Sequence, residues 1–248
     1  MPSPFRFAAR TLLASALALP TALHGQSGNG FLFGRPHVTV SLRGGVAQPT
    51  ASSDVFAFSS QRLTLGRGDY LGGAYGLELG LRVAERLDVQ IGVAYSNRKA
   101  NSEFRDWIDN NDKPIEQTTS FRRTPITLGL KYYLTSPGRT LGRLAWIPAR
   151  IAPYVSAGGG VMSYDYRQSG DFVDFKSFDV FHSTLSSHAL AAMVYGAAGV
   201  DYSLTPNLSV MTEARYDASR AKMNNDFQGF NHIDLSALAV TAGLNVRF

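Results

Sequence analysis

The sequence predicts an all-β fold, an eight-stranded antiparallel up-and-down transmembrane β-barrel. Three observations support this prediction. Apolar residues occupy every second position in eight segments after residue 25, which is the spacing of side chains on one face of a strand. The segments are about 10–14 residues long, and a tilted strand needs ~9–11 residues to cross a bilayer. The connections differ in length in a roughly alternating way, as in barrels with long loops on one side of the membrane.

The first 25 residues are predicted to be a secretory signal peptide. Arg6 and Arg10 make the start of the chain basic, and the apolar stretch TLLASALALPTAL follows at 11–23. This stretch is too short for a spanning helix and matches the apolar core of an export signal. We therefore assign 1–25 to a signal peptide, cleaved between Ala22 and Ser27, and 26–248 to one barrel domain.

Composition excludes several other classes of protein. The 248 residues include no cysteine, so a disulfide framework, a thiolate metal site, a cysteine nucleophile and a lipoprotein anchor are all excluded. Hydrophobic residues make up 44% of the chain, too many for a disordered protein. Without residues 1–25 the chain has 22 basic and 19 acidic residues, a net charge of +3, which does not predict nucleic-acid binding.

The first four strands are predicted at 38–46, 74–83, 87–96 and 126–134. In each of them, large apolar residues alternate with small or polar ones. A tight turn at Glu85–Arg86 joins the second strand to the third. The third strand shows the alternation most clearly, with one apolar face formed by Leu87, Val89, Ile91, Val93 and Tyr95.

The last four strands are predicted at 151–164, 190–204, 208–217 and 238–248. The fifth is blurred by PYVSAGGGV at 153–161, whose glycines permit close packing or a bulge. The turn Thr205-Pro206-Asn207 separates the sixth strand from the seventh. The eighth ends the chain with an apolar face of Leu238, Val240, Ala242, Leu244, Val246 and Phe248.

The connections are predicted to place long loops at one end of the barrel. The long ones cover 49–69, 97–118, 165–187 and 218–232, and we expect them outside the cell. The second and sixth connections are only a few residues long. The fourth, at 135–150, is longer, and we interpret it as an enlarged periplasmic turn with room for a short helix.

The composition of the two faces predicts that the apolar face points outward into lipid. The polar face is rich in Gly, Ala, Ser and Thr with a few charged residues, which fits the narrow lumen of an eight-stranded barrel. The exterior of a soluble barrel would carry many more charges. Aromatic residues near the strand ends are expected to form the interfacial girdles, namely Tyr75, Tyr95, Tyr132, Tyr154, Tyr164, Tyr202, Tyr216 and Phe248.

Four segments carry a resemblance to a known family. They are TPITLGLKYYL (124–134), PYVSAGGGV (153–161), AAGVDYSLTPNLSVMTEARY (197–216) and GLNVRF (243–248). They resemble the small outer-membrane β-barrel family, which includes the transmembrane domain of outer membrane protein A and its X-type and W-type relatives. The resemblance implies the outer membrane of a Gram-negative bacterium, with outer-membrane lipid and lipopolysaccharide as neighbours.

The resemblance also implies a sorting signal at the C-terminus. In this family a terminal aromatic residue on an alternating last strand is recognised by the barrel-insertion machinery, and periplasmic chaperones escort the chain to it. Phe248, with Val246 and Leu244, matches that pattern. We expect a monomer.

Charged residues on the polar face are expected to form a network in the lumen. They are Arg43, Glu78, Lys131, Glu213 and Arg215. Charges removed from water need partners, so we expect salt bridges. The network would be either a gate for a narrow water path or a plug that keeps the barrel closed. The plug is favoured because eight strands leave little free bore.

The third long loop has an aromatic repeat. Phe172, Phe175, Phe178 and Phe181 recur every three residues and would form one apolar edge of a turn or short helix. This edge is a candidate contact surface for lipopolysaccharide or a host molecule, or a portal for a small hydrophobic ligand. The alternatives are a self-packed loop or an extension of the strands above the membrane.

We predict no enzymatic activity, cofactor or metal. His182-Ser183 and Ser187-His188, with Asp179 nearby, are the residues that could serve a lipid-A-modifying enzyme. Adjacent residues on a strand point to opposite faces, so neither pair is preorganised. The segment 109–112 has acidic and amide residues that suggest calcium, but Pro114 stands where a calcium loop requires glycine.

The predicted function is therefore a non-enzymatic outer-membrane barrel with a structural or surface-interaction role and a largely closed lumen. The main alternative is a W-type channel for small hydrophobic molecules, and a weaker one is a lipid-A-modifying enzyme.

Overall fold

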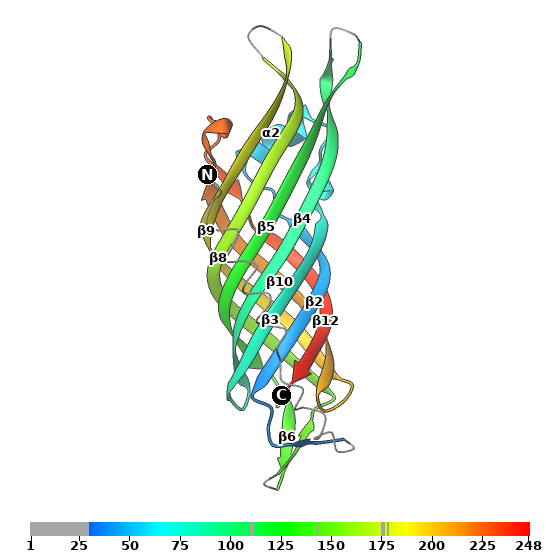
Figure 1. Cartoon of the computed structure of the whole chain (residues 1–248), viewed down its shortest axis with the longest axis vertical. Helices are drawn as coiled ribbons and strands as arrows, with labels where there is room; N and C mark the ends of the chain where they lie inside the picture. The colour runs from blue at the N-terminus through cyan, green and yellow to red at the C-terminus, as the bar shows by residue number, and fades with distance from the viewer. Residues whose placement is uncertain (1–29, 110–111, 143, 175–176, 178) are drawn as a thin grey trace, which may run out of the picture.

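A computed structural model describes residues 30–109, 112–142, 144–174, 177 and 179–248. The predicted signal peptide lies outside these residues. Eight antiparallel strands form a closed ring (Figure 1), and the predicted fold class is confirmed. The strands of the ring are β2 (Val38–Pro49), β3 (Gly72–Ala84), β4 (Leu87–Ile108), β5 (Pro114–Tyr133), β8 (Ile151–Val173), β9 (Val180–Ser203), β10 (Leu208–Lys222) and β12 (Ala237–Arg247).

The ring closes because the first and last strands pair with each other. Val40 on β2 is in register with Val246 on β12. The backbone N–H of Phe248 extends this ladder by donating to the carbonyl of Val38 at 2.9 Å. Each neighbouring pair around the ring, from β2–β3 to β10–β12, is antiparallel. The ring therefore has no open edge, which a sheet inside a bilayer requires.

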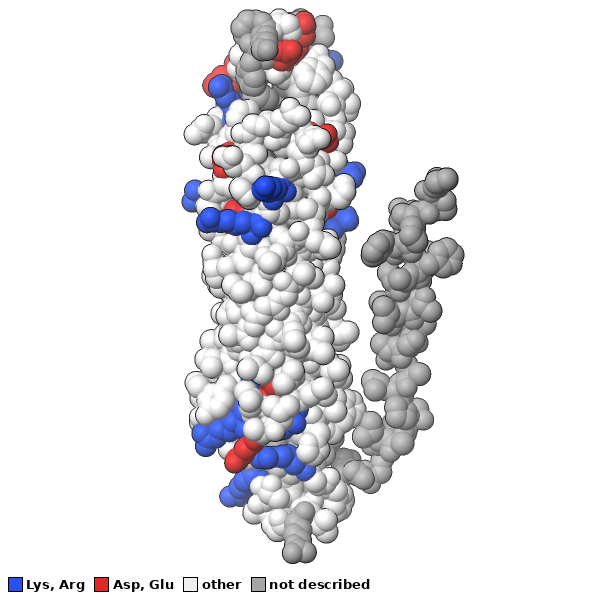
Figure 2. Space-filling model, turned by 90° about the vertical axis from the view of Figure 1, so that its left-hand side faces the viewer, with Lys and Arg blue, Asp and Glu red and all other residues white. Residues whose placement is uncertain are grey.

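Apolar side chains cover the outside of the middle of the barrel. Leu42, Leu128 and Val194 are 64%, 58% and 62% exposed, respectively. On the face that Figure 2 shows, a broad band without charged residues lies between two charged bands. We call the outer surface of this region the apolar band. Its side chains can be buried only in lipid, as the sequence analysis predicts from the composition of the two faces.

Most of the predicted girdle tyrosines face outward, but two do not. Tyr75, Tyr132 and Tyr216 are 63%, 45% and 47% exposed at the limits of the apolar band. Tyr154 and Tyr164 are only 1% and 2% exposed. The prediction was wrong for these two because even-numbered residues of β8 point into the barrel.

The predicted loops 97–118 and 165–187 are mostly strand, which corrects the sequence analysis. β4 continues upward to Ile108 and β5 begins at Pro114, while β8 continues to Val173 and β9 begins at Val180. Above Tyr95 the apolar residues of β4 change face, because Ala100 and Phe104 point inward and are buried. The outward apolar residues therefore stop at the upper limit of the apolar band, whereas the strands continue above it.

A hydrophobic core closes the upper end of the barrel, the end with the long hairpins. Two further short elements of the loops belong to this region, η1 (Arg67–Tyr70) and β11 (His232–Asp234). Phe56 on α2 (Asp54–Arg62) has its ring centroid 5.6 Å from that of Phe121 on β5 and 5.8 Å from that of Tyr166 on β8. Phe227 on η2 (Asn225–Phe227) also contacts Tyr166, with ring centroids 5.5 Å apart. These buried side chains form what we call the upper core. Within the described residues, no helix is long and apolar enough to cross a membrane.

A small sheet lies at the lower end of the barrel. The connection at 135–150 forms a hairpin of β6 (Gly138–Leu141) and β7 (Ala145–Pro148), and β1 (Leu32–Phe33) pairs with β7. The helix considered for this connection is wrong in the described residues. Trp146 is 1% exposed, and a Cβ atom at Gly138 would collide with its ring. The guanidinium of Arg247 lies 6.0 Å from the Trp146 ring centroid, which ties the hairpin to the last strand of the barrel.

Asp234 fastens the loop that follows β2 to the upper core. Its carboxylate accepts hydrogen bonds from the Ser52 hydroxyl at 2.6 Å and from the Ser236 N–H at 3.0 Å. Burial by itself would raise the pKa of Asp234, but these hydrogen bonds outweigh burial and hold the pKa below its ordinary value. The folded state therefore favours the charged form of the Asp234 carboxyl group more than the unfolded state does.

Replacing Phe56 by alanine should open the upper core without opening the barrel. A buried Phe-to-Ala change costs about 3–5 kcal/mol, so amide exchange in residues 54–70 should rise on the order of 100-fold or more. Exchange in residues 126–133 should not change. Gln61→Ala, on the exposed face of the same helix, is the control and should behave as wild type. Equal protection of residues 54–70 in both variants would contradict this account of the core.

The Asp234 anchor should weaken in acid. Because the pKa of Asp234 is lowered on folding, its stabilisation is complete above the pKa of an unfolded aspartate, ~3.9, and is lost as the pH falls through the lower folded-state pKa. Amide exchange at residues 50–54, corrected for intrinsic rates, should accelerate in that pH range. Asp234→Asn should exchange faster at neutral pH and lose this acid dependence. An unchanged pH profile in the variant would refute the assignment.

Candidate functional site

The charged side chains of the lumen are the first candidate site. They point inward because each lies on the strand face opposite the apolar band. Arg43 is the centre of the network. Its Nη1 lies 2.7 Å from Oε1 of Glu213 and 3.4 Å from Oε2 of Glu78, and all three side chains are at most 7% exposed. One guanidinium therefore bridges two carboxylates from β3 and β10.

Neutral side chains satisfy the remaining oxygens of these carboxylates. The Tyr154 hydroxyl donates to Oε2 of Glu213 at 3.0 Å. The Gln90 amide donates to Oε1 of Glu78. Buried charges are stable only when such additional hydrogen bonds accompany the ion pair. The network therefore holds β2, β3, β4, β8 and β10 in one register across the lumen.

A second cluster lies nearer the lower end and centres on Asp201. Lys131 donates to Oδ2 of Asp201 at 3.1 Å, and the Tyr133 hydroxyl donates to the same oxygen at 3.0 Å. Asn245 on β12 donates to Oδ1 at 3.0 Å. The Lys131 ammonium also lies 3.6 Å from the ring centroid of Tyr154, a cation–π contact that joins the two clusters.

Arg215 forms a third buried pair. Its Nε lies 2.8 Å from Oδ1 of Asp217, and its guanidinium carbon lies 3.6 Å from the ring centroid of Tyr195. Arg82 and Asp88 pair similarly near the lower end, at 2.6 Å. A small cavity of about 40 Å³ lies beside Arg43 and Arg215. It has room for about one or two water molecules.

The structure places all five charged residues of the predicted network inside the lumen, but not in one cluster. Arg43, Glu78 and Glu213 meet, whereas Lys131 and Arg215 pair with Asp201 and Asp217. Sequence analysis missed these two aspartates as partners. Their signal was present, since both lie on the inward face of their predicted strands.

Arg123 is buried in a different way. It is 4% exposed, and its Nη1 and Nη2 donate to the Leu235 carbonyl at 3.0 Å and the Ser96 hydroxyl at 3.1 Å. Among the described residues it makes no ion pair. These hydrogen bonds join β5 to β4 and to the backbone of Leu235, which belongs to the upper core.

The candidate catalytic residues are not brought together. Ser187 is fully buried, and its hydroxyl is hydrogen-bonded to the Tyr164 hydroxyl at 2.8 Å, while its neighbour His188 is exposed on the other face. His182 pairs with Asp171 across the β8–β9 ladder, with Nδ1 2.9 Å from Oδ1. This pair is exposed, and Ser183 faces away from it on the strand. The described residues therefore form no base-activated serine here.

The aromatic repeat of 172–181 belongs to a strand hairpin. Phe172 and Phe181 are opposite each other in the β8–β9 ladder, and their rings stack with centroids 6.1 Å apart. The predicted turn or short helix is wrong at these two positions, because the strands extend this far above the membrane. Phe175 and Phe178 lie outside the described residues.

The residues of the predicted sorting signal lie on the last strand and its end. Leu244 and Val246 are 48% and 36% exposed on the outer face, within the apolar band. Phe248 follows the last residue of β12 and is partly exposed.

Together, a closed ring of eight strands, an apolar outer band and paired charges inside define a membrane-spanning β-barrel protein. The family model described as the outer membrane protein beta-barrel domain matches residues 11–248, and the chain belongs to this family. No curated protein matches the chain at a significant level.

Three solved structures are similar to this chain at low sequence identity. Neisserial surface protein A is 16% identical, with 85% of this chain and 97% of that chain covered and a TM-score of 0.49. A major outer membrane protein from Thermus thermophilus is 14% identical, with 87% and 100% covered and a TM-score of 0.44. The outer membrane protease OmpT from Escherichia coli is 12% identical, with 87% and 98% covered and a TM-score of 0.44. At these values no activity is transferred to this chain.

Removing Arg43 should destabilise the barrel strongly. Arg43→Met would leave Glu78 and Glu213 buried without a cation, and breaking a buried pair in this way costs about 3–5 kcal/mol. The measurement is urea unfolding of the barrel in lipid vesicles. Arg43→Met/Glu78→Gln/Glu213→Gln, which removes all three charges, should recover part of the loss. Lys113→Met at an exposed hairpin tip is the control. A wild-type midpoint for Arg43→Met would contradict the network.

Proposed function

We propose that this protein is a non-enzymatic barrel of the outer membrane of a Gram-negative bacterium, with a closed lumen and a structural or surface-interaction role. The observation that carries the proposal is the filled interior. The five predicted lumenal charges are ion-paired, a hydrophobic core lies in the upper mouth and a small sheet lies at the lower end. Such an interior supports a scaffold more than a conduit.

The upper end supports a role at the cell surface. In this family the long loops face outward, so the long hairpins and the upper core would lie outside the cell. β4, β5, β8 and β9 continue well above the apolar band as one sheet. The upper core packs against its inner face. A rigid sheet held in this way is suited to present a recognition surface.

Two other functions receive less support. A channel for small hydrophobic molecules would use the stacked Phe172 and Phe181 as its portal, but the upper core separates the mouth from the lumen. A lipid-A-modifying enzyme would need a serine next to a histidine, and Ser187 is buried away from His188.

The remaining partners follow from the same proposal. Residues 1–25 would direct export, and Phe248 with Val246 and Leu244 would be recognised by the insertion machinery after periplasmic chaperones deliver the chain. Outer-membrane lipid would then surround a monomer, since the closed ring leaves no strand edge within the bilayer for a second copy.

The folded chain should be electrically silent in planar bilayers. A lumen filled by ion pairs leaves no continuous water path, so no discrete conductance steps are expected, with or without a small apolar compound such as an alkane. The Phe56→Ala variant, which opens only the upper core, should also be silent. Regular steps in the wild type that respond to the apolar compound would overturn the closed-barrel proposal in favour of the channel.

A further inference from the structure

A polar groove of about 950 Å³ lies on the outer face of the long strands, above the apolar band. Outward side chains on neighbouring strands are in register there, so they form rows across β4, β5, β8 and β9. The row nearest the membrane is Asn97, Arg122, Asp165 and His188. The next row outward is Lys99, Ser120, Arg167 and Ser186.

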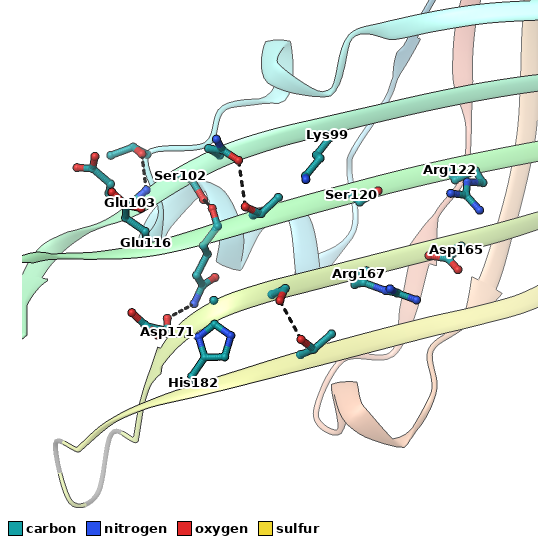
Figure 3. A pocket seen from close by; sticks show the side chains of 17 residues that line it. Lys99, Ser102, Glu103, Glu116, Ser120, Arg122, Asp165, Arg167, Asp171 and His182 are labelled. Atoms are coloured by element: carbon teal, nitrogen blue, oxygen red, sulfur yellow. Dashed lines mark hydrogen bonds and ion pairs between the residues drawn. The ribbon is translucent and has the colours of Figure 1, made fainter.

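Three cations in these two rows are free to bind an anion. Lys99, Arg122 and Arg167 are exposed, line the groove and make no ion pair with any described residue. Figure 3 shows them on three neighbouring strands of the sheet. Asp165 is opposite Arg122 in the ladder but is not paired with it. Three cations with one carboxylate leave an excess of positive charge.

The cations lie above the apolar band, at the end of the groove nearest the membrane. Tyr95 and Leu190 are the last outward residues of the apolar band on β4 and β9, and Asn97 and His188 follow them in the first row. Two residues advance a strand by ~7 Å, and less along the membrane normal because the strands tilt. On their own strands the last outward apolar residues are Tyr95, Ile126 and Val161, so Lys99 and Arg122 lie two outward steps above the apolar band and Arg167 lies three.

The opposite end of the groove is acidic. Glu103, Glu116 and Asp171 lie toward the hairpin tips, with His182 beside Asp171 (Figure 3). Between the two ends are neutral hydroxyl groups, including those of Thr118 and Ser169. An anionic ligand is therefore attracted to the membrane side of the groove and repelled from its outer end. A ligand anchored in the membrane satisfies this polarity best.

We propose that this groove binds the phosphate-bearing saccharide headgroup of a lipid in the surrounding outer leaflet. Lys99, Arg122 and Arg167 contact the phosphates, and the hydroxyl groups above them donate to and accept from the sugar. The acyl chains lie against the apolar band below. This inference rests on the proposed surface role and names the ligand class for it.

The test measures binding of lipopolysaccharide to the folded full chain in zwitterionic detergent at low ionic strength. Each Lys or Arg near an anionic lipid surface adds about fivefold to binding. Lys99→Gln/Arg122→Gln/Arg167→Gln should therefore bind about 100-fold more weakly. Wild-type binding should fall by a similar factor when the lipid A phosphates have been removed enzymatically.

Matched controls separate a specific site from general attraction. Arg67→Gln/Lys113→Gln/Lys222→Gln removes the same charge from exposed upper residues that do not line the groove, and it should bind within about twofold of wild type. Inorganic phosphate at the same phosphate concentration should not displace the lipid. Displacement would assign the cations to a soluble anion and overturn the lipid assignment.

Two further results would contradict the proposal that the groove binds a lipid headgroup. One is wild-type binding by the Lys99/Arg122/Arg167 triple variant, and the other is an equal loss in the control variant. Either result would leave the closed-barrel proposal intact if the chain is silent in planar bilayers. If the wild type conducts in planar bilayers and only the Lys99/Arg122/Arg167 triple variant loses lipopolysaccharide binding, the closed-barrel proposal is wrong. The proposal for the groove is then retained.

Discussion

The constraint on which this structure depends is that a bilayer offers no partner for a backbone N–H or carbonyl. A sheet can cross it only as a closed ring, and β12 closes the ring on β2 up to the hydrogen bonds of Phe248. Eight strands enclose a bore only wide enough for side chains. Charges inside it cannot reach water, so Arg43 has to sit between Glu78 and Glu213. The paired lumen is thus a consequence of closure with few strands.

The fold was predictable where lipid surrounds the strands, because lipid imposes one rule on each residue in turn. Leu87 to Tyr95 alternate strictly for that reason. Above the membrane the outside becomes water, and the apolar residues move to the inner face, as with Ala100 and Phe104. A strand prediction that follows one continuous apolar face therefore stops where the apolar residues change face. The extension of β4, β5, β8 and β9 was therefore missed.

The elements that depend on distant contacts could not be predicted. The sequence of α2 has little amphipathic pattern. The helix is held in place because Phe56 packs against Phe121 on β5 and Tyr166 on β8. The hairpin of β6 and β7 forms because Trp146 packs near Arg247, about a hundred residues later in the chain. The five lumenal charges followed from strand parity, but their partners Asp201 and Asp217 required the register of non-neighbouring strands. The alternation along a strand predicts which face a residue lies on. Its partner across the lumen is known only once the register of the closed barrel is known.

The difference between the interior of the barrel and its outer face above the lipid also explains the two proposals for function. The interior is determined by closure and supports a static barrel, whereas the outer face above the lipid faces water and carries cations that make no ion pair with a described residue. The central claim is the closed barrel in the outer membrane. Its most direct test is the gel mobility of the chain from the outer-membrane fraction, before and after boiling in detergent. We expect the unboiled chain to migrate as a compact species that shifts on boiling. A chain recovered in the soluble periplasm with no shift would contradict the account.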